Sequence, residues 1–256
     1  YSARLALFGL GSFAPDLRGP CPIGSMRFCW NGHKTMTPKS ILLFAAGFGT
    51  RMAPLTNTCP KPLVEVAGKA LLDHAIDQCA GLNIVVNAHY FADQIEQYVK
   101  GRDIKVSDET DELRETGGGL KHAMPILNSN PVFTMNTDAV WKGDNPITTL
   151  RSAWHDDMDA LLLMIPRAST FGHLGGGDFN IDSETRLAHG TDYVYSGVQI
   201  IRTDGLVHIT ESAFSMWSLW TDMLERGTMH GVAYHGRWCD VGRPDSISIA
   251  ESMLAG

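Results

Sequence analysis

The sequence predicts an α/β fold with a mainly parallel central sheet and helices on both faces. Short apolar runs alternate with segments whose apolar residues recur at helical spacing. The links between them are short, which favours β-α-β crossovers. The 256 residues, of which 44% are hydrophobic, are enough to build one large core. In such a fold, ligands bind at the carboxyl ends of the strands.

The elements follow in order after residue 40. In the first half, a strand is expected at residues 41–46, which form a continuous apolar run, and further strands are expected at 83–88, 104–107 and 131–136. The expected helices between them span residues 71–80, 91–100 and 119–127. The second half is less regular, with strands at residues 159–165 and 193–202, a glycine-rich loop at 172–177, and helices near 214–223 and 244–254. The last helix is expected to pack through Ile247, Ile249, Ala250 and Leu254.

Composition excludes several classes of protein. The formal net charge of −7 argues against a nucleic-acid binder. No apolar run approaches the roughly twenty residues that span a bilayer, so no membrane partner is expected. The five cysteines form no C-x-x-C pair, which argues against a zinc site or a disulfide framework. We therefore expect a cytoplasmic protein, monomeric or a small homo-oligomer, that acts on small molecules.

Residues 1–38 differ from the rest and are expected to be an N-terminal extension, disordered or not native, ahead of a single domain at 39–256. Met36 directly precedes the first elements and resembles a natural start. A secretory signal is the alternative reading of the apolar run at residues 5–10. That run is short and no cleavage pattern follows it clearly.

A candidate phosphate loop follows the first strand. Its glycines, Gly47 and Gly49, allow backbone amides to approach an anion closely. Arg51 and Lys61 add positive charge suited to a polyphosphate. The spacing matches neither a dinucleotide fingerprint nor a P-loop. Strand-Gly-x-Gly turns also occur in α/β proteins that bind no ligand there, so the two glycines alone do not establish a phosphate site.

Two carboxylates are candidate metal ligands. Asp138 follows the strand at residues 131–136, and Asp240 lies among apolar neighbours. If they converge, they repel each other unless a cation joins them, and oxygen ligands favour Mg²⁺. The alternatives are that Asp138 caps a turn and that Asp240 pairs with an arginine.

Two glycine segments are further candidates. Gly117 and Gly118 are expected to precede a helix, where backbone can lie close to a base or ribose. The second segment is the glycine-rich loop at residues 172–177. Asp178, which follows it directly, is either a sugar-hydroxyl acceptor or a turn residue. Base choice stays open, because uracil, thymine and guanine could each find partners among Asn87, Glu109 and backbone amides.

The run AAGFGTRMAPLT at residues 45–56, followed by PKPL at 60–63, closely resembles the signature of the sugar-1-phosphate nucleotidyltransferases. The resemblance spans about residues 39–254 and implies a single Rossmann-like domain. Within the family it is strongest to the branch that uridylylates N-acetylmuramate 1-phosphate in bacterial cell-wall recycling. Mannose-1-phosphate guanylyltransferases are similar too and give the alternative activity. A non-catalytic nucleotide-sugar sensor is a further alternative, although the chain keeps both acids and both cations.

The resemblance also implies roles for residues. The implied catalytic residues are Arg51, Lys61 and Asp138, and the implied Mg²⁺ ligands are Asp138 and Asp240. The implied nucleotide-binding residues are Gly47, Phe48, Gly49, Thr50, Arg51, Lys61, Gly117, Gly118 and Asn136, and the implied sugar-binding residues are Asp178, Ser196 and Gly197. Two residues depart from the family pattern: Phe48 stands where many relatives have a basic residue, and Thr137 where many have glycine.

Overall fold

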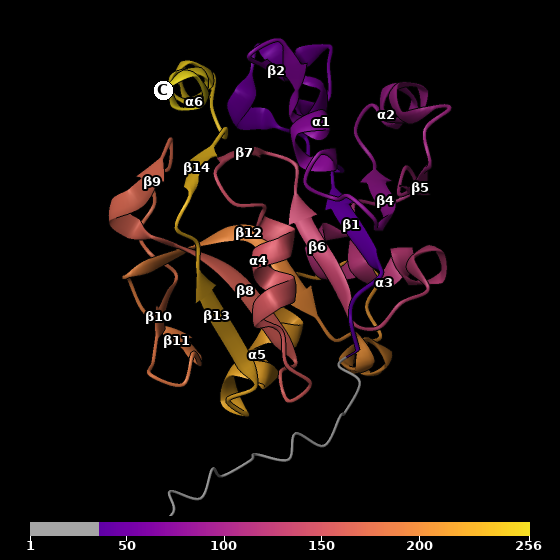
Figure 1. Cartoon of the computed structure of the whole chain (residues 1–256). Helices are drawn as coiled ribbons and strands as arrows, with labels where there is room; N and C mark the ends of the chain where they lie inside the picture. The colour runs from indigo at the N-terminus through magenta and orange to yellow at the C-terminus, as the bar shows by residue number, and fades with distance from the viewer. Residues whose placement is uncertain (1–35) are drawn as a thin grey trace, which may run out of the picture. The chain divides into compact units, whose positions relative to one another are not determined.

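The computed structural model describes residues 36–256 (Figure 1). The expected extension at residues 1–38 lies almost wholly outside the described part. Of its last residues, Met36 donates its backbone N–H to Asp156 Oδ1 at 3.0 Å, and Pro38 is buried. No helix within residues 36–256 is long and apolar enough to cross a membrane.

The central sheet has a parallel half built from β1 (Ser40–Phe44), β4 (Asn83–Ala88), β5 (Ile104–Asp108) and β6 (Val132–Asn136). β1 lies between β4 and β6, and β5 pairs with β4 at the edge. All four expected strands are present, and β1, at the centre of this half, contains the continuous apolar run expected of a strand buried on both faces. The carboxyl ends of these strands therefore share one edge.

The other half of the sheet is mostly antiparallel. β12 (Tyr193–Ile201) pairs with β6 and with β8 (Ala160–Pro166), and β13 (Met229–Ala233) runs parallel to β8. β10 (Phe179–Ile181) and β11 (Leu187–His189) extend it. The smaller sheets consist of β7 (Ala139–Lys142), β14 (Arg237–Asp240) and β9 (Thr170–Phe171), and of the pair β2 (Glu65–Val66) and β3 (Lys69–Ala70).

Helices cover both faces, as expected. They are α1 (Leu71–Ile76), α2 (Ala92–Val99), α3 (Glu115–Leu127), α4 (Pro146–Ala153), α5 (Trp217–Glu225) and α6 (Asp245–Ala255). Ile41 and Leu43 of β1 belong to the apolar cluster that contains α1, α2 and α4, whereas Leu42 belongs to the cluster of α3 and α5. Successive strand side chains point to opposite faces, so one strand serves both clusters. Short 3₁₀ helices complete the fold at Thr50–Met52, Leu55–Asn57, Lys61–Leu63, Arg167–Ser169 and Asp204–His208.

Three helix expectations need correction. α1 ends at Ile76 and continues as turns, rather than reaching residue 80. α3 begins at Glu115, so the expected loop of glycines is the helix's own first turns. In α6, Ile249 is 41% exposed, and the buried residues are Ser246, Ala250 and Met253. At the start of α3, a contact from a distant segment overrides the local pattern, because the Phe214 carbonyl accepts the N–H groups of Gly117 and Gly118.

Candidate active site

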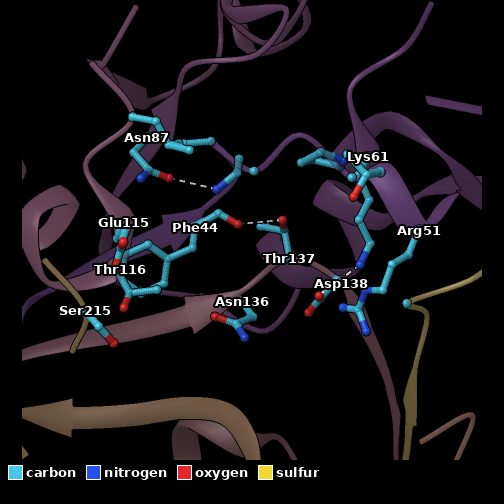
Figure 2. A pocket seen from close by; sticks show the side chains of 18 residues that line it. Phe44, Arg51, Lys61, Asn87, Glu115, Thr116, Asn136, Thr137, Asp138 and Ser215 are labelled. Carbon is cyan, nitrogen blue, oxygen red and sulfur yellow. Dashed lines mark hydrogen bonds and ion pairs between the residues drawn. The ribbon is translucent and has the colours of Figure 1, made fainter. Parts of the chain in front are cut away.

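A cavity of about 520 Å³ opens at the carboxyl ends of β1, β4 and β6 and at the start of α3. Its lining residues are Phe44, Ala45, Ala46, Gly47, Gly49, Thr50, Arg51, Lys61, Pro62, Asn87, Leu113, Glu115, Thr116, Asn136, Thr137, Asp138, Ser215 and Gly242. Figure 2 shows two ends: Arg51, Lys61 and Asp138 lie together, and Asn87, Glu115, Thr116 and Ser215 lie away from them. Most of the expected nucleotide-binding residues therefore share one pocket.

The phosphate loop runs along one wall of this cavity. Gly49 has a φ of 63°, and a Cβ there would lie 2.9 Å from Lys61 Cβ, so glycine is required. The Thr56 hydroxyl donates to the Gly49 carbonyl at 2.9 Å and fixes the turn. A Cβ on Gly47 would meet nothing within 4 Å, because Gly47 borders the open cavity. The loop can therefore receive a ligand as well as form a turn.

Phe48 does not line this cavity. Its ring is 46% exposed and packs against His89 and Tyr90, with ring centroids 5.6 and 5.4 Å apart. The structure thus turns Phe48 away from the cavity that the neighbouring Gly47 and Gly49 line. Its expected contact with the nucleotide stays a prediction.

Lys61 and Asp138 line the pocket and form an ion pair there. Lys61 begins the 3₁₀ helix Lys61–Leu63, and its ammonium donates to Asp138 Oδ2 at 2.9 Å. The Thr137 hydroxyl donates to the Phe44 carbonyl at 2.7 Å and ties the end of β6 to β1 (Figure 2). Thr137 therefore acts as a strand anchor. Asp138 reaches the ligand cavity instead of serving only as a turn cap.

Asp240 comes to Asp138 from the far end of the chain. β14 pairs with β7, and the Val241 N–H donates to the Asp138 carbonyl at 2.8 Å. Burial and the negative charge of Asp138 raise the pKa of Asp240 above its ordinary value. Lys61, Arg51 and His173 lower this pKa, but by less. Its ion-pair partner within the described residues is His173, whose Nδ1 is 3.8 Å from Oδ2. The two acids converge closely enough to repel.

This pair fits a cation that takes few protein ligands. Residues 36–256 contain no group of three or more His, Cys, Asp or Glu side chains placed to hold a metal. Mg²⁺ is commonly bound by one or two carboxylates together with waters and substrate phosphates. The convergence of Asp138 and Asp240, which the Val241 N–H bond to the Asp138 carbonyl holds side by side, is the observation that favours a cation there.

Gly117 and Gly118 have a packing role in the structure. Both are buried, and both donate their N–H to the Phe214 carbonyl, at 2.9 and 3.0 Å. A Cβ on Gly117 would lie 2.5 Å from the Phe214 ring, and one on Gly118 would lie 2.2 Å from the Ser212 carbonyl oxygen. Neither lines the cavity, so their nucleotide contact stays a prediction. The pocket is lined instead by the preceding residues Leu113, Glu115 and Thr116, which sequence analysis did not select.

The expected sugar-binding residues lie outside the described cavity lining. Asp178 is exposed, and its Oδ2 accepts the Tyr195 N–H at 2.8 Å. Ser196 is 3% exposed, and Gly197, with a φ of 87°, packs against the Asn136 side chain. Asn136, which was expected to bind the nucleotide, does line the cavity. A role in sugar binding remains a prediction for all three.

A glycine loop with two cations beside a pair of acids, of which Asp138 lines the cavity and Asp240 lies next to it, is an arrangement expected of an enzyme that handles nucleoside triphosphates. The chain belongs to the family of MobA-like NTP transferase domains, whose model matches residues 41–174. It is similar to the N-acetylmuramate alpha-1-phosphate uridylyltransferase of Caulobacter vibrioides, with 37% identity over 86% of this chain and 99% of that protein. A protein of the same name from Neisseria meningitidis is 29% identical over 83% of this chain and 96% of its own length.

More distant relatives include the mannose-1-phosphate guanyltransferase of Gibberella zeae, 30% identical over 79% of this chain and 60% of that protein. Among solved structures, the inositol-1-phosphate CTP transferase of T. maritima has a TM-score of 0.69 at 15% identity, covering 87% of this chain and 98% of that one. This structure shows the fold alone. Together the relatives confirm the resemblance to sugar-1-phosphate nucleotidyltransferases, the α/β fold and the transferase class.

Proposed function

We propose that this chain transfers a uridylyl group from UTP to N-acetylmuramate 1-phosphate, giving a UDP-sugar and pyrophosphate. The single observation that carries the proposal is the 37% identity to an uridylyltransferase of that kind, extending over 99% of its length. The pocket supports the reaction class, because phosphate-binding and acidic groups line one cavity. A role in bacterial cell-wall recycling follows from that substrate.

The residues act by positioning and by neutralising charge. Amides of the loop around Gly47 and Gly49, with Arg51 and Lys61, hold the triphosphate in place. An oxygen of the sugar 1-phosphate attacks the α-phosphorus in line and forms a new P–O bond, while the bond to the β-phosphate breaks and pyrophosphate leaves. Preorganised cations stabilise the charge that develops in this step. No covalent intermediate with the protein is required.

We propose Asp138 and Asp240 as the residues that would hold Mg²⁺. When bound, the cation would offset the charge of the reacting phosphates. Lys61, which is bonded to Asp138, lies next to the same group and can contact a phosphate oxygen as well. Asp178, Ser196 and Gly197 are proposed to border the sugar on the side of Asn136, against which Gly197 packs.

The remaining proposals concern the setting of the enzyme. We propose that it works in the cytoplasm on a nucleoside triphosphate and a sugar 1-phosphate, as a monomer or small homo-oligomer. The negative net charge supports partners other than nucleic acid.

A screen of nucleoside triphosphates against sugar 1-phosphates, read by pyrophosphate release, tests the function. The expected result is Mg²⁺-dependent release with UTP and N-acetylmuramate 1-phosphate. Preferred turnover of GTP with mannose 1-phosphate would replace the substrate pair but keep the reaction class. Tight binding of a nucleotide-sugar with no release from any pair would favour the sensor.

A further inference from the structure

Glu109 is a buried acid that the proposed reaction does not use. It follows β5 directly and is 0% exposed. Its Oε1 accepts the Asn87 Nδ2–H at 2.9 Å, while Oε2 has no hydrogen-bond partner among the described residues. Burial raises the pKa of this carboxyl, which shows how poorly the site solvates a charge. Because a buried, half-satisfied carboxyl costs folding free energy, we expect Glu109 to have a function.

Its partner Asn87 has a fixed amide orientation. Asn87 Oδ1 accepts the Ala45 N–H at 2.7 Å, and Nδ2 donates to Glu109 (Figure 2 shows the first bond). A flipped amide would set Oδ1 against the Glu109 carboxylate and Nδ2 against an N–H, so both bonds would be lost. The chain Glu109–Asn87–Ala45 joins the ends of three neighbouring parallel strands, β5, β4 and β1.

Helix α3 leaves room for this pair. A Cβ on Gly119 would lie 2.9 Å from Glu109 Oε1 and 3.0 Å from Asn87 Nδ2. The pair therefore explains why residue 119 is glycine, independently of helix packing. Any side chain at this position would collide with the Glu109 carboxylate and the Asn87 amide. The buried acid, the amide and the glycine form one local unit.

Asn87 also lines the cavity, at the end away from the cations. Figure 2 places it with Glu115, Thr116 and Ser215, apart from Arg51 and Lys61. In an extended nucleoside triphosphate, the base lies at the opposite end from the phosphates. With the phosphates on Arg51 and Lys61, the base would lie near Asn87, whose Nδ2 carries a second N–H.

We propose that Asn87, oriented by Glu109, presents an N–H donor to a carbonyl oxygen of the nucleobase. The site would then favour a base with a carbonyl over one with an amino group at that position, as in uracil against cytosine. Glu109 is a positioning residue that acts through Asn87. The inference rests on the proposed function, which supplies the nucleotide and its direction in the pocket.

Calorimetric titration of the full chain with UTP and with CTP, each with Mg²⁺, tests the inference. Wild type should bind UTP at least about tenfold more tightly than CTP, because cytosine would set an amino group against the donor. Asn87→Ala should lose that preference, and Asn87→Ser should do so if the alanine variant does not fold. Glu109→Leu should lose it as well, although Asn87 is intact. Glu109→Gln should recover it, because glutamine keeps an acceptor oxygen for Nδ2.

The chain offers a matched control. Asn130 makes the same pair of bonds outside the cavity: its Oδ1 accepts the Thr203 N–H at 2.9 Å, and its Nδ2 donates to Asp204 at 2.9 Å. Asp204→Leu should keep the wild-type preference for UTP. Equal binding of UTP and CTP by wild type, or an unchanged preference in Glu109→Leu, would overturn the inference alone. Binding of neither nucleotide by wild type would instead contradict the proposed function.

Discussion

The parallel and antiparallel halves of the sheet treat their polar residues differently. At the carboxyl ends of two parallel strands, Asn87 of β4 meets Asn136 and Asp138 of β6 and the turn after it in one cavity. On the antiparallel side, Asp178 bonds to a backbone N–H and Ser196 is buried. Parallel strands bring all their carboxyl ends to one edge, whereas antiparallel strands alternate their ends between two edges. A polar residue after a strand is therefore a stronger sign of a site in the first half.

Glycines show the same contrast. Gly47 borders the open cavity, and a Cβ there would meet nothing within 4 Å, so the fold does not require its lack of a side chain. Gly197 has a φ of 87°, and a Cβ there would lie 2.8 Å from Asn136 Nδ2, so its lack of a side chain serves the fold. The two positions allow function and stability to be tested separately.

The largest expected effect tests the parallel edge. Asp138→Asn should lower kcat by a factor on the order of a thousand, because it removes one of the two carboxylates proposed to hold the cation at the reacting phosphates. The thermal unfolding midpoint should change little, since the Asp138 side chain is 32% exposed. Pyrophosphate release and thermal unfolding measure the two effects.

The matched control comes from the antiparallel side. Asp182 Oδ1 accepts the N–H groups of Glu184 and Arg186, both at 2.8 Å, and asparagine can keep these bonds. Asp182→Asn should leave kcat unchanged. A lower unfolding midpoint with an unchanged kcat in Asp138→Asn would make Asp138 structural and remove the contrast between the halves.

Alanine at Gly47 and at Gly197 should have smaller effects, one on substrate binding and the other on stability. Gly197→Ala should lower the free energy of unfolding by about 1–3 kcal/mol, because alanine is strained at this φ and crowds Asn136. Gly47→Ala should leave that free energy nearly unchanged and raise the KM for UTP, because its methyl group enters the cavity. Urea unfolding and steady-state kinetics report the two. The contrast fails if Gly47→Ala destabilises the fold as much as Gly197→Ala does.

The smallest effect concerns the buried acid that joins the parallel strands. Because burial raises the pKa of Glu109, the folded chain binds this proton more tightly than the unfolded chain. The resulting stabilisation is full below the ordinary glutamate pKa and is lost as pH rises through the raised one. The stability of Glu109→Gln relative to wild type should therefore increase from acid to neutral pH. Urea unfolding at a series of pH values measures this difference in stability. A difference that does not change with pH would contradict the raised pKa of Glu109.

The sequence by itself determined the parallel half and the phosphate end of the site. The strand predicted at residues 83–88 has the same bounds as β4, whose centre is the apolar run at residues 84–86. Gly49 and Arg51 line the cavity as predicted, since a glycine turn and a cation lie close together in the chain. Asp138 was placed correctly in the crevice because it directly follows such a strand.

Only the tertiary structure decided what depends on distant segments. α3 begins at Glu115 and buries its glycines because the segment around Phe214 packs against its first turn. Asp240 reaches Asp138 through the pairing of β14 with β7, and Asn87 takes its orientation from Glu109. Phe48 turns away because His89 and Tyr90 offer it a packing surface. Local periodicity carries no record of these partners, because each contact joins residues that are far apart in the chain.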